Sequence, residues 1–434
     1  MAQYRSDTHK LDSGQVVTRY EVMMLSDRIS PSGTMTDAFG RLRVSEPLTL
    51  FDSQQRYQDN GKFSTANNGT SSVTHVASES AVNMTIGTAN NDYVYRETNK
   101  VFAYQPGKSL LIMNTFAMNT PTANVTQRIG YFGVDNGIFL ENDGTTNNIV
   151  LRSNTTGTIV ETRVAQTSWN YDKFDGTGYS KQSSGPEHNS LDVTKTNIFW
   201  IDIEWLGVGD VRCGFVVDGL MKIAHVFHND NVNLAPYMTT ACLPIRYEIE
   251  NVGTTTGSST LKQICSTVVS EGGYSISGKQ ISVGGTVASP KNIPTAGTFV
   301  PIISIRLKSD RLDAIVIPDA VNIFGLTNNA TYTYKIVLGG TLTGASWSTA
   351  TTGSSVEYDI TATSISGGTD IKIGYFQVSA GAGAQNVSFQ DGLFRFQLER
   401  NSFTSTPTIF SIVATGDSTN NKAIASLDWQ EIFQ

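Results

Sequence analysis

The stretch "NIFWIDIEW", residues 197–205, alternates apolar and polar side chains. In an extended strand its apolar face carries Phe199, Ile201 and Ile203, and its other face carries Asp202 and Glu204. This period of two predicts a β-strand with one buried face. The stretch "VVDGLMKIAH", residues 216–225, follows and predicts a hairpin closed at Asp218-Gly219, because Asp-Gly supplies positive φ angles at low cost.

The same pattern continues in both directions along the chain. Further strands are predicted at "SLLIMNTFAM" (109–118), "QRIGYFGV" (127–134), "PIRYEIENV" (244–252), "FVPIISIRLKS" (299–309), "TYTYKIVLGG" (331–340) and "AIASLDWQEIF" (423–433). No amphipathic helix of three turns is evident. The chain is therefore predicted to be all-β, with an extended N-terminal arm (1–60), a jelly-roll-like β-sandwich (61–272) and a second C-terminal β-sandwich (273–434).

Composition narrows the possible functions. The 434 residues include 39 Gly, only 16% charged residues and 39% hydrophobic residues, which is typical of many short strands joined by polar turns. The net charge of −7 argues against nucleic-acid binding, which needs a basic surface.

Three widely spaced cysteines, Cys213, Cys242 and Cys265, form no metal or redox motif and indicate reduced thiols made in a cytoplasm. The first residues, "MAQYRSDTHKLDSGQ", lack the apolar segment of a signal peptide. No apolar run is long enough to span a bilayer, so we expect no membrane insertion.

Catalytic chemistry has little support in the sequence. Asp202 and Glu204 share a strand face, as two carboxylates of a glycosidase could, but two acids on a solvent-facing strand surface explain them more simply. The Gly-Val-Gly of residues 207–209 lacks the third glycine and the helix of a phosphate-binding loop. We therefore predict a protein that is not an enzyme and has no catalytic residues and no cofactor.

The stretch "AHVFHND", residues 224–230, contains His225, His228 and Asp230. Histidines three residues apart on one strand point to opposite faces, so they cannot share an ion without a bulge. We assign no metal site here.

Aromatic residues gather in and before a long polar loop, residues 171–192. Flat rings at Trp169, Tyr171 and Tyr179 could stack on sugars, which makes them possible glycan contacts. The alternative is that these rings pack the loop onto its own domain or onto a neighbouring subunit.

The stretches "TDAFGRLRVSEPLTLFDSQQRY" (36–57), "IDIEWLGVGDVRCGFVVDG" (201–219) and "PYMTTACLPIRYEIEN" (236–251) resemble segments of virion structural proteins from tailed bacteriophages, many of them marine or infecting cyanobacteria. The central zone also resembles concanavalin-A-like jelly rolls, a fold used for both scaffolding and glycan contact. The resemblance implies a tail, fibre or baseplate component on the particle exterior, made in the host cytoplasm. Alternatives are a capsid decoration protein and a module that binds host glycans.

The segment from Ser30 to Tyr57 mixes apolar residues with arginines among turn formers. We interpret it as part of an arm that docks on other virion proteins or on another copy of the chain in a homo-oligomer, with a trimer as the usual fibre symmetry. The alternative is a strand that covers the chain's own sandwich. The predicted anchors are Phe39, Arg41, Leu42, Arg43, Val44 and Phe51.

Overall fold

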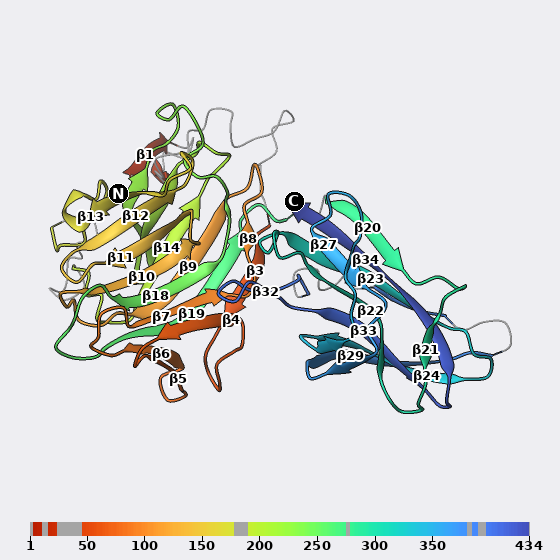
Figure 1. The fold of residues 1–434 in the computed structure, drawn as a ribbon. Helices are drawn as coiled ribbons and strands as arrows, with labels where there is room; N and C mark the ends of the chain where they lie inside the picture. Colours follow the sequence, from red (N-terminus) through yellow and green to blue (C-terminus); the bar gives the residue numbers. More distant parts are fainter. Residues whose placement is uncertain are drawn as a thin grey trace. The chain divides into compact units, whose positions relative to one another are not determined.

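The computed structural model describes residues 3–10, 16–23, 46–177, 190–274, 278–379, 384–388 and 396–433 (Figure 1). The chain divides into two compact units, Met1–Glu46 and Pro47–Gln434. In the first unit, β1 (Gln3–Lys10) pairs antiparallel with β2 (Val16–Met23). The second unit contains two successive β-sandwiches, here called the first and the second sandwich.

The first sandwich has a seven-stranded sheet, in which neighbouring strands are antiparallel in the order β13-β12-β11-β10-β18-β7-β4. Alternate residues of β18, such as Ile245, Tyr247 and Ile249, point into the core. The strands are β4 (Phe63–Asn68), β7 (Tyr93–Thr98), β10 (Val125–Phe132), β11 (Gly137–Asn142), β12 (Asn147–Ser153), β13 (Val160–Ala165) and β18 (Ile245–Asn251).

The opposing sheet has eight strands. They are β3 (Leu48–Ser53), β5 (Ser72–Val76), β6 (Ala81–Ile86), β9 (Leu110–Ala117), β14 (Asn197–Ile203), β15 (Val211–Val217), β16 (Leu220–Phe227) and β19 (Ser259–Ser270). A short pair, β8 (Phe102–Ala103) with β17 (Cys242–Leu243), and a 3-10 turn, η1 (Gln166–Ser168), complete this sandwich.

The stretch that predicts the fold behaves largely as expected. β14 places Phe199, Ile201 and Ile203 in the core between the sheets. β15 and β16 form the predicted hairpin, and Asp218 and Gly219 at its turn have φ angles of 51° and 75°, as a type I′ turn requires.

The opposite face of β14 is not open to solvent, which differs from the expected outward face. Trp200 on that face is 2% exposed, and its ring lies over Gly214, its partner across the strands, where a Cβ would meet the ring at 2.8 Å. Gly214 therefore provides the space that the Trp200 ring fills.

The second sandwich packs a five-stranded sheet against a six-stranded sheet around Trp429, Tyr332 and Ile412. The first sheet contains β20 (Lys279–Gly284), β21 (Lys291–Ile293), β23 (Ile315–Gly325), β30 (Ala384–Ser388) and β34 (Asn421–Phe433). The second sheet contains β22 (Val300–Leu307), β24 (Thr331–Leu338), β26 (Ser348–Thr349), β27 (Val356–Asp359), β29 (Thr369–Gln377) and β33 (Phe410–Gly416). Two short pairs join β25 (Thr341–Thr343) to β28 (Ser364–Ser366) and β31 (Arg400–Asn401) to β32 (Thr406–Pro407).

The predicted fold class is confirmed: the chain is all-β, with a jelly-roll-like sandwich followed by a second sandwich. Residues 48–53, which the sequence analysis assigned to the arm, form β3 and pair with β19 of the first sandwich. This corrects the C-terminal end of the predicted arm. Within the described residues, no helix is long and apolar enough to cross a membrane.

Candidate functional site

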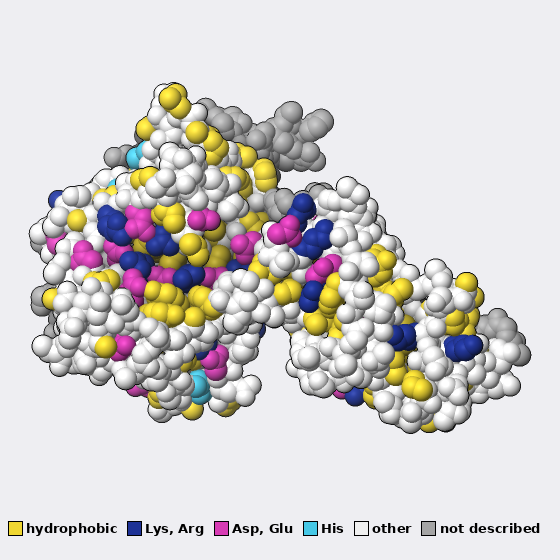
Figure 2. Space-filling view, viewed as in Figure 1, with side chains coloured by type: hydrophobic (Ala, Val, Ile, Leu, Met, Phe, Trp, Pro, Cys, Tyr) yellow, Lys and Arg dark blue, Asp and Glu magenta, His cyan; other side chains and the backbone are white. Residues whose placement is uncertain are grey.

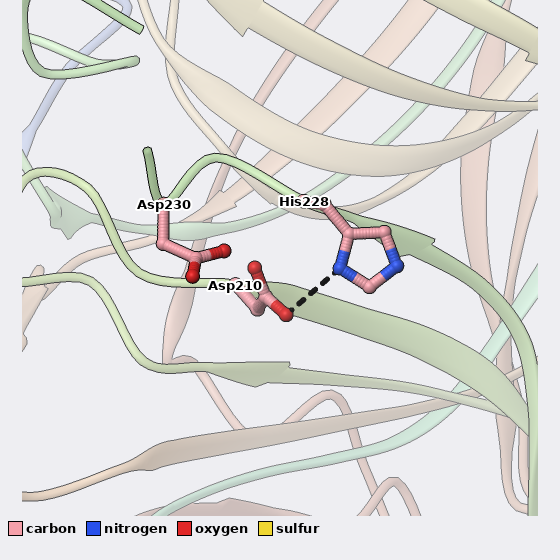
Figure 3. A group of neighbouring side chains, drawn as sticks. All are labelled: Asp210, His228 and Asp230. Carbon is pink, nitrogen blue, oxygen red and sulfur yellow. Dashed lines mark hydrogen bonds and ion pairs between the residues drawn. The ribbon is translucent and has the colours of Figure 1, made fainter. Parts of the chain in front are cut away.

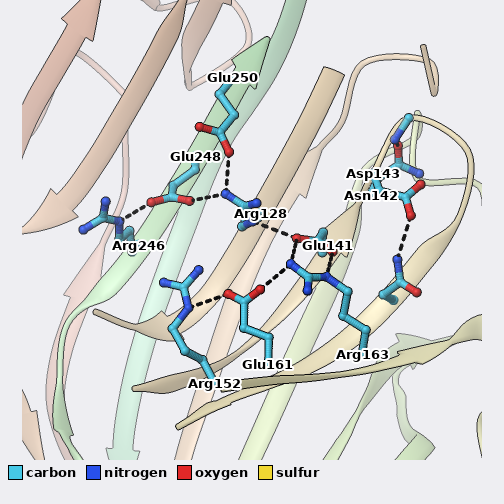
Figure 4. A network of polar contacts seen from close by, with 12 residues as sticks. Arg128, Glu141, Asn142, Asp143, Arg152, Glu161, Arg163, Arg246, Glu248 and Glu250 are labelled. Atoms are coloured by element: carbon cyan, nitrogen blue, oxygen red, sulfur yellow. Dashed lines mark hydrogen bonds and ion pairs between the residues drawn. The ribbon is translucent and has the colours of Figure 1, made fainter. Parts of the chain in front are cut away.

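A network of ion pairs covers the outer face of the seven-stranded sheet, the face turned away from the eight-stranded sheet (Figure 4). The strand register creates it, because Arg128 on β10 lies opposite both Glu141 on β11 and Glu248 on β18. Arg128 Nε lies 2.8 Å from Glu141 Oε2, and its Nη1 lies 3.1 Å from Glu248 Oε2. Opposite charges facing each other across strands stabilise a sheet.

The network extends through β12 to the edge strand β13 of the same sheet. Arg152 Nε on β12 lies 2.7 Å from Oε1 of Glu161, its cross-strand neighbour on β13. Arg163 Nε lies 2.8 Å from Glu141 Oε1, and Arg163 also binds Glu161. Figure 2 shows the resulting concentration of basic and acidic side chains on this sandwich.

Aromatic rings lie beneath the arginines. Phe132, Phe139 and Val150 form a small buried apolar cluster separate from the main core. The guanidinium of Arg152 lies 4.9 Å from the centre of the Phe139 ring, and that of Arg246 lies 5.8 Å from the centre of the Phe132 ring. The arginine side chains therefore cover apolar surface as well as neutralising acids.

The arginines hold two carboxylates of this face, those of Glu248 and Glu161, ionised. Burial by itself would raise the pKa of Glu248, but the charges of Arg246 and Arg128 outweigh it and lower that pKa. The pKa of Glu161 is lowered in the same way, by Arg152 in particular, against the effect of burial. Neither group has the raised pKa of a general acid.

A cleft of about 1030 Å³ lies beside the network. Tyr93 and Tyr95, two residues apart on β7, stack in its wall with ring centres 4.4 Å apart. Burial and the hydrogen bond that it donates to Glu250 raise the pKa of Tyr95, so its phenol stays neutral. The cleft therefore offers a flat aromatic wall next to charged groups.

Loops of the second sandwich complete this cleft and join the two sandwiches. Arg400 is 3% exposed, and its Nη2 lies 2.7 Å from Oε1 of Glu97 on β7. Glu97 forms a second ion pair, in which its Oε2 lies 2.7 Å from Arg246 Nη1. Arg400 donates to the carbonyl oxygen of Thr98 at 2.8 Å and lies 3.0 Å from Asp313 Oδ1. We call these contacts the buried joint.

The sequence singled out Asp202 and Glu204 as the one carboxylate pair with catalytic potential. The structure pairs Asp202 with Arg212 across the β14–β15 ladder and leaves Glu204 exposed just after β14. Asp202 is 7% exposed, so it is not the solvent-facing acid that the simpler explanation required. Burial raises the pKa of Asp202, while the charge of Arg212 opposes the rise.

Two of the three predicted glycan-contact residues, Trp169 and Tyr171, lie within the described residues. Trp169 is 2% exposed and packs against Phe174 and Phe215 in the core, so its assignment as a glycan contact is wrong. The alternative, in which the ring packs the loop onto its own domain, describes Trp169 correctly. Tyr171 is 55% exposed, and Tyr179 lies outside the described residues.

Among the predicted arm anchors, only Phe51 falls within the described residues. It is 7% exposed and packs against Phe63 and Phe102 in the first sandwich. Its assignment to a contact with another chain is therefore wrong, and the alternative of a strand on the chain's own sandwich holds for residues 48–53. The other predicted anchors lie outside the described residues: Phe39, Arg41, Leu42, Arg43 and Val44.

Near the predicted histidines, the structure brings together a different set of side chains (Figure 3). His228 and Asp230 meet Asp210, which the sequence analysis did not single out, and His225 is not part of the group. The pairing of β15 with β16 creates this group. Asp210 lies at the open end of the predicted hairpin, opposite the Asp218-Gly219 turn, and this position could have identified it from the sequence.

No family model matches this chain, and no curated protein matches it. Among solved structures, a β-glucanase of Bacillus licheniformis is similar with 10% identity and a TM-score of 0.33, covering 52% of this chain and 99% of its own. Peanut lectin has 12% identity and a TM-score of 0.30, covering 52% and 98%. A carbohydrate esterase from the Shiga toxin-encoding bacteriophage phi24B has 12% identity and a TM-score of 0.31, covering 52% and 100%. Likenesses this distant assign no activity to this chain.

Fold and site together define a class: an all-β protein of two joined sandwiches, the first with an ion-paired outer face and a cleft beside it.

Proposed function

We propose that this chain is a non-enzymatic structural subunit on the exterior of a tailed-phage particle, in a tail, fibre or baseplate. The observation that carries the proposal is the buried joint. Arg400 and Glu97 are both almost fully buried, and each makes a further ion pair, with Asp313 and Arg246 respectively. A joint of this kind suits a part that must keep its shape under load. The resemblance of residues 36–57, 201–219 and 236–251 to virion structural proteins supports the same class.

The state of the carboxylates supports a role without catalysis. Glycoside hydrolysis needs one carboxyl group that is protonated and can donate to the leaving oxygen. On the outer face, arginines hold Glu248 and Glu161 ionised, so neither can supply that proton. Asp202 on the other sheet has a pKa raised by burial, but its carboxylate is paired with Arg212. Incubating the purified protein with host surface polysaccharide should leave the polymer length unchanged. Shortening that is lost in Glu204→Gln would establish a depolymerase instead.

Location on the particle is the direct test. Antibodies against the second sandwich, residues 279–433, would be used to gold-label intact virions. Label on the tail or its appendages supports the proposal. Label spread over the head makes the chain a capsid decoration protein, and particles without label or detectable chain refute a virion role.

The arm is proposed to attach the subunit to other virion proteins or to further copies, with a trimer as the expected homo-oligomer. Because β3 belongs to the first sandwich, the test removes residues 1–46 and keeps β3 intact. The truncated protein should fold, by circular dichroism, yet elute as a monomer in size-exclusion chromatography with light scattering. Assembly equal to that of the full chain would contradict the role of the arm.

Binding of a host glycan is a second candidate function, favoured by the stacked Tyr93 and Tyr95 in the wall of the cleft. An aromatic wall can bury a sugar face while neighbouring charged groups bind hydroxyls. Tyr93→Ala should abolish a signal on a glycan array, whereas Tyr171→Ala, which removes an exposed ring that does not line the cleft, should leave the signal unchanged. A wild-type protein that binds nothing on a broad array would remove this candidate.

A further inference from the structure

Three side chains with metal-binding atoms meet where β15 begins and β16 ends (Figure 3). Asp210 directly precedes β15, and His228 directly follows β16. Because Val211 pairs with Phe227, Asp210 and His228 lie across from each other one step beyond the paired residues. Asp230 follows two residues later. One donor atom from each of the three lies within 4.8 Å of the other two, and His228 Nδ1 lies 3.0 Å from Asp210 Oδ2.

A β-bulge sets this geometry. The turn pairs Val217 with Leu220, and without a bulge the same register would place Gly209, not Asp210, opposite His228. The shift between Cys213 and Gly214 inserts one extra residue in β16 and moves Asp210 into that position. Bulges commonly re-aim side chains next to functional sites.

The backbone around these side chains is fixed by a buried amide. Asn229, between two of the three residues, is 5% exposed, and its Nδ2 donates to the carbonyl oxygens of Gly209 at 3.1 Å and Phe227 at 3.4 Å. Its backbone N–H donates to Asp210 Oδ1 at 3.4 Å. The loop before β15 and the loop after β16 are therefore held together by the chain's own contacts, so the backbone that carries the three side chains is positioned in advance.

We propose that Asp210, His228 and Asp230 together bind one divalent transition-metal ion, with Zn²⁺ as the representative. An imidazole nitrogen with carboxylate oxygens suits Zn²⁺ and its neighbours in the first transition row, whereas Ca²⁺ and Mg²⁺ prefer oxygen ligands alone. Two carboxylates at this separation repel each other, and a divalent ion between them removes that repulsion. The His228 side chain is 52% exposed, so an ion can enter from solvent and water can fill the remaining positions.

His225 is not a ligand of this ion. It lies on β16 three residues before His228, is 7% exposed, and packs its ring edge-on against Phe227 at 4.6 Å. The prediction that the two histidines do not share one ion is therefore consistent with the structure. Asp210, which the sequence analysis did not consider, supplies the third metal-binding side chain.

The ion would cross-link two loops with exposed apolar side chains. Leu206 and Val208 lie on the loop before β15, and Val232 and Leu234 lie on the loop after β16; Leu206 and Leu234 are 57% and 108% exposed. These loops already touch, because the backbone N–H of Tyr237 donates to the Gly207 carbonyl oxygen at 3.2 Å. Metal binding should therefore stiffen this end of the first sandwich.

The test titrates ZnCl₂ into the full chain, stripped of metal by dialysis against chelator, with isothermal calorimetry at pH 7.5. The wild type should bind Zn²⁺, and His228→Ala and Asp230→Asn should each weaken that binding by at least about tenfold. Asp135→Asn, which changes an exposed aspartate in the β10–β11 turn, is the matched control and should bind as the wild type. CaCl₂ should bind at least about tenfold more weakly than ZnCl₂.

Circular dichroism melts of the metal-free proteins show whether the variants fold. Both substitutions replace side chains at the surface, so the melts should coincide with the wild type. No Zn²⁺ binding by the wild type would overturn the proposal. Zn²⁺ binding that is undiminished in both His228→Ala and Asp230→Asn would overturn it too, since the ion would then be held elsewhere on the chain.

Discussion

Replacing Arg400 by methionine tests the buried joint. Methionine keeps the unbranched apolar stem but removes the guanidinium and its charge. The change breaks the 2.7 Å pair with Glu97, the 3.0 Å pair with Asp313 and the 2.8 Å hydrogen bond to Thr98. Removing one partner of a buried pair costs about 3–5 kcal/mol, because the other charge stays buried without compensation. Glu97 keeps Arg246 at 2.7 Å, so we expect a loss of about 3 kcal/mol, at the lower end of that range.

The assay combines urea unfolding with hydrogen exchange. Urea unfolding gives the loss in free energy of unfolding. Hydrogen exchange should be faster at residues 97–101 and 396–401 in the variant than in the wild type. These two segments are joined by hydrogen bonds, from Gln397 Nε2 to the Val101 carbonyl oxygen and from the Arg400 N–H to the Asn99 carbonyl oxygen. The matched control is Lys262→Met. It breaks an ion pair with Glu79 whose side chains are 37% and 42% exposed, and it should cost about 0–1 kcal/mol. If Arg400→Met lowers the free energy of unfolding no more than the control does, the buried joint does not hold the two sandwiches together. The proposal of a rigid structural subunit would then lose the observation that carries it.

Three further outcomes follow from the packing. Phe51→Ala should destabilise the first sandwich by about 3–5 kcal/mol in urea unfolding, as loss of a core ring does; a change below about 1 kcal/mol would mean that β3 is dispensable. Trp169→Ala should cost about 3–5 kcal/mol, whereas Tyr171→Ala should stay within about 0.5 kcal/mol, and equal effects would contradict the buried position of Trp169. Burial lowers the pKa of His225 from 6.5 to about 4, so the unfolded chain takes up a proton first and stability is lost as pH falls from 6.5 towards 4. His225→Gln should flatten the free energy of unfolding over that interval, and an unchanged slope would assign the acid sensitivity to other groups.

Short-range signals in the sequence predict many of the strands, although β3 was assigned to the arm. β14 and the turn at Asp218-Gly219 form as expected, because alternation and turn chemistry are properties of neighbouring residues. Burial of Phe51 and Trp169 depends on partners such as Phe102 and Phe215, roughly fifty residues away along the chain. An aromatic residue near a polar loop therefore looks the same in the sequence whether it faces solvent or the core.

The ion-pair network and the group of Asp210, His228 and Asp230 both depend on the register of paired strands. Local sequence patterns do not reveal that register. Arg128 meets Glu248 across 120 residues of chain, through a strand pairing that no local pattern specifies. Asp210 meets His228 only because of the bulge near Gly214. A one-residue difference in register changes which side chains face each other, so single-sequence reasoning can name the residues without placing them together.

The outer face of the seven-stranded sheet explains why alternation in this sandwich does not mean exposure. All six residues of β11 are buried, although its side chains alternate between the core and the outer face. On that outer face Phe139 lies under Arg152, and Glu141 is bound by Arg128 and Arg163. Burying an acid is costly unless it is paired, and pairing with arginines also lowers the pKa of Glu248 and of Glu161 on other strands of the same sheet. An outer face bound in this way should make the sheet more rigid, as the proposed structural role requires.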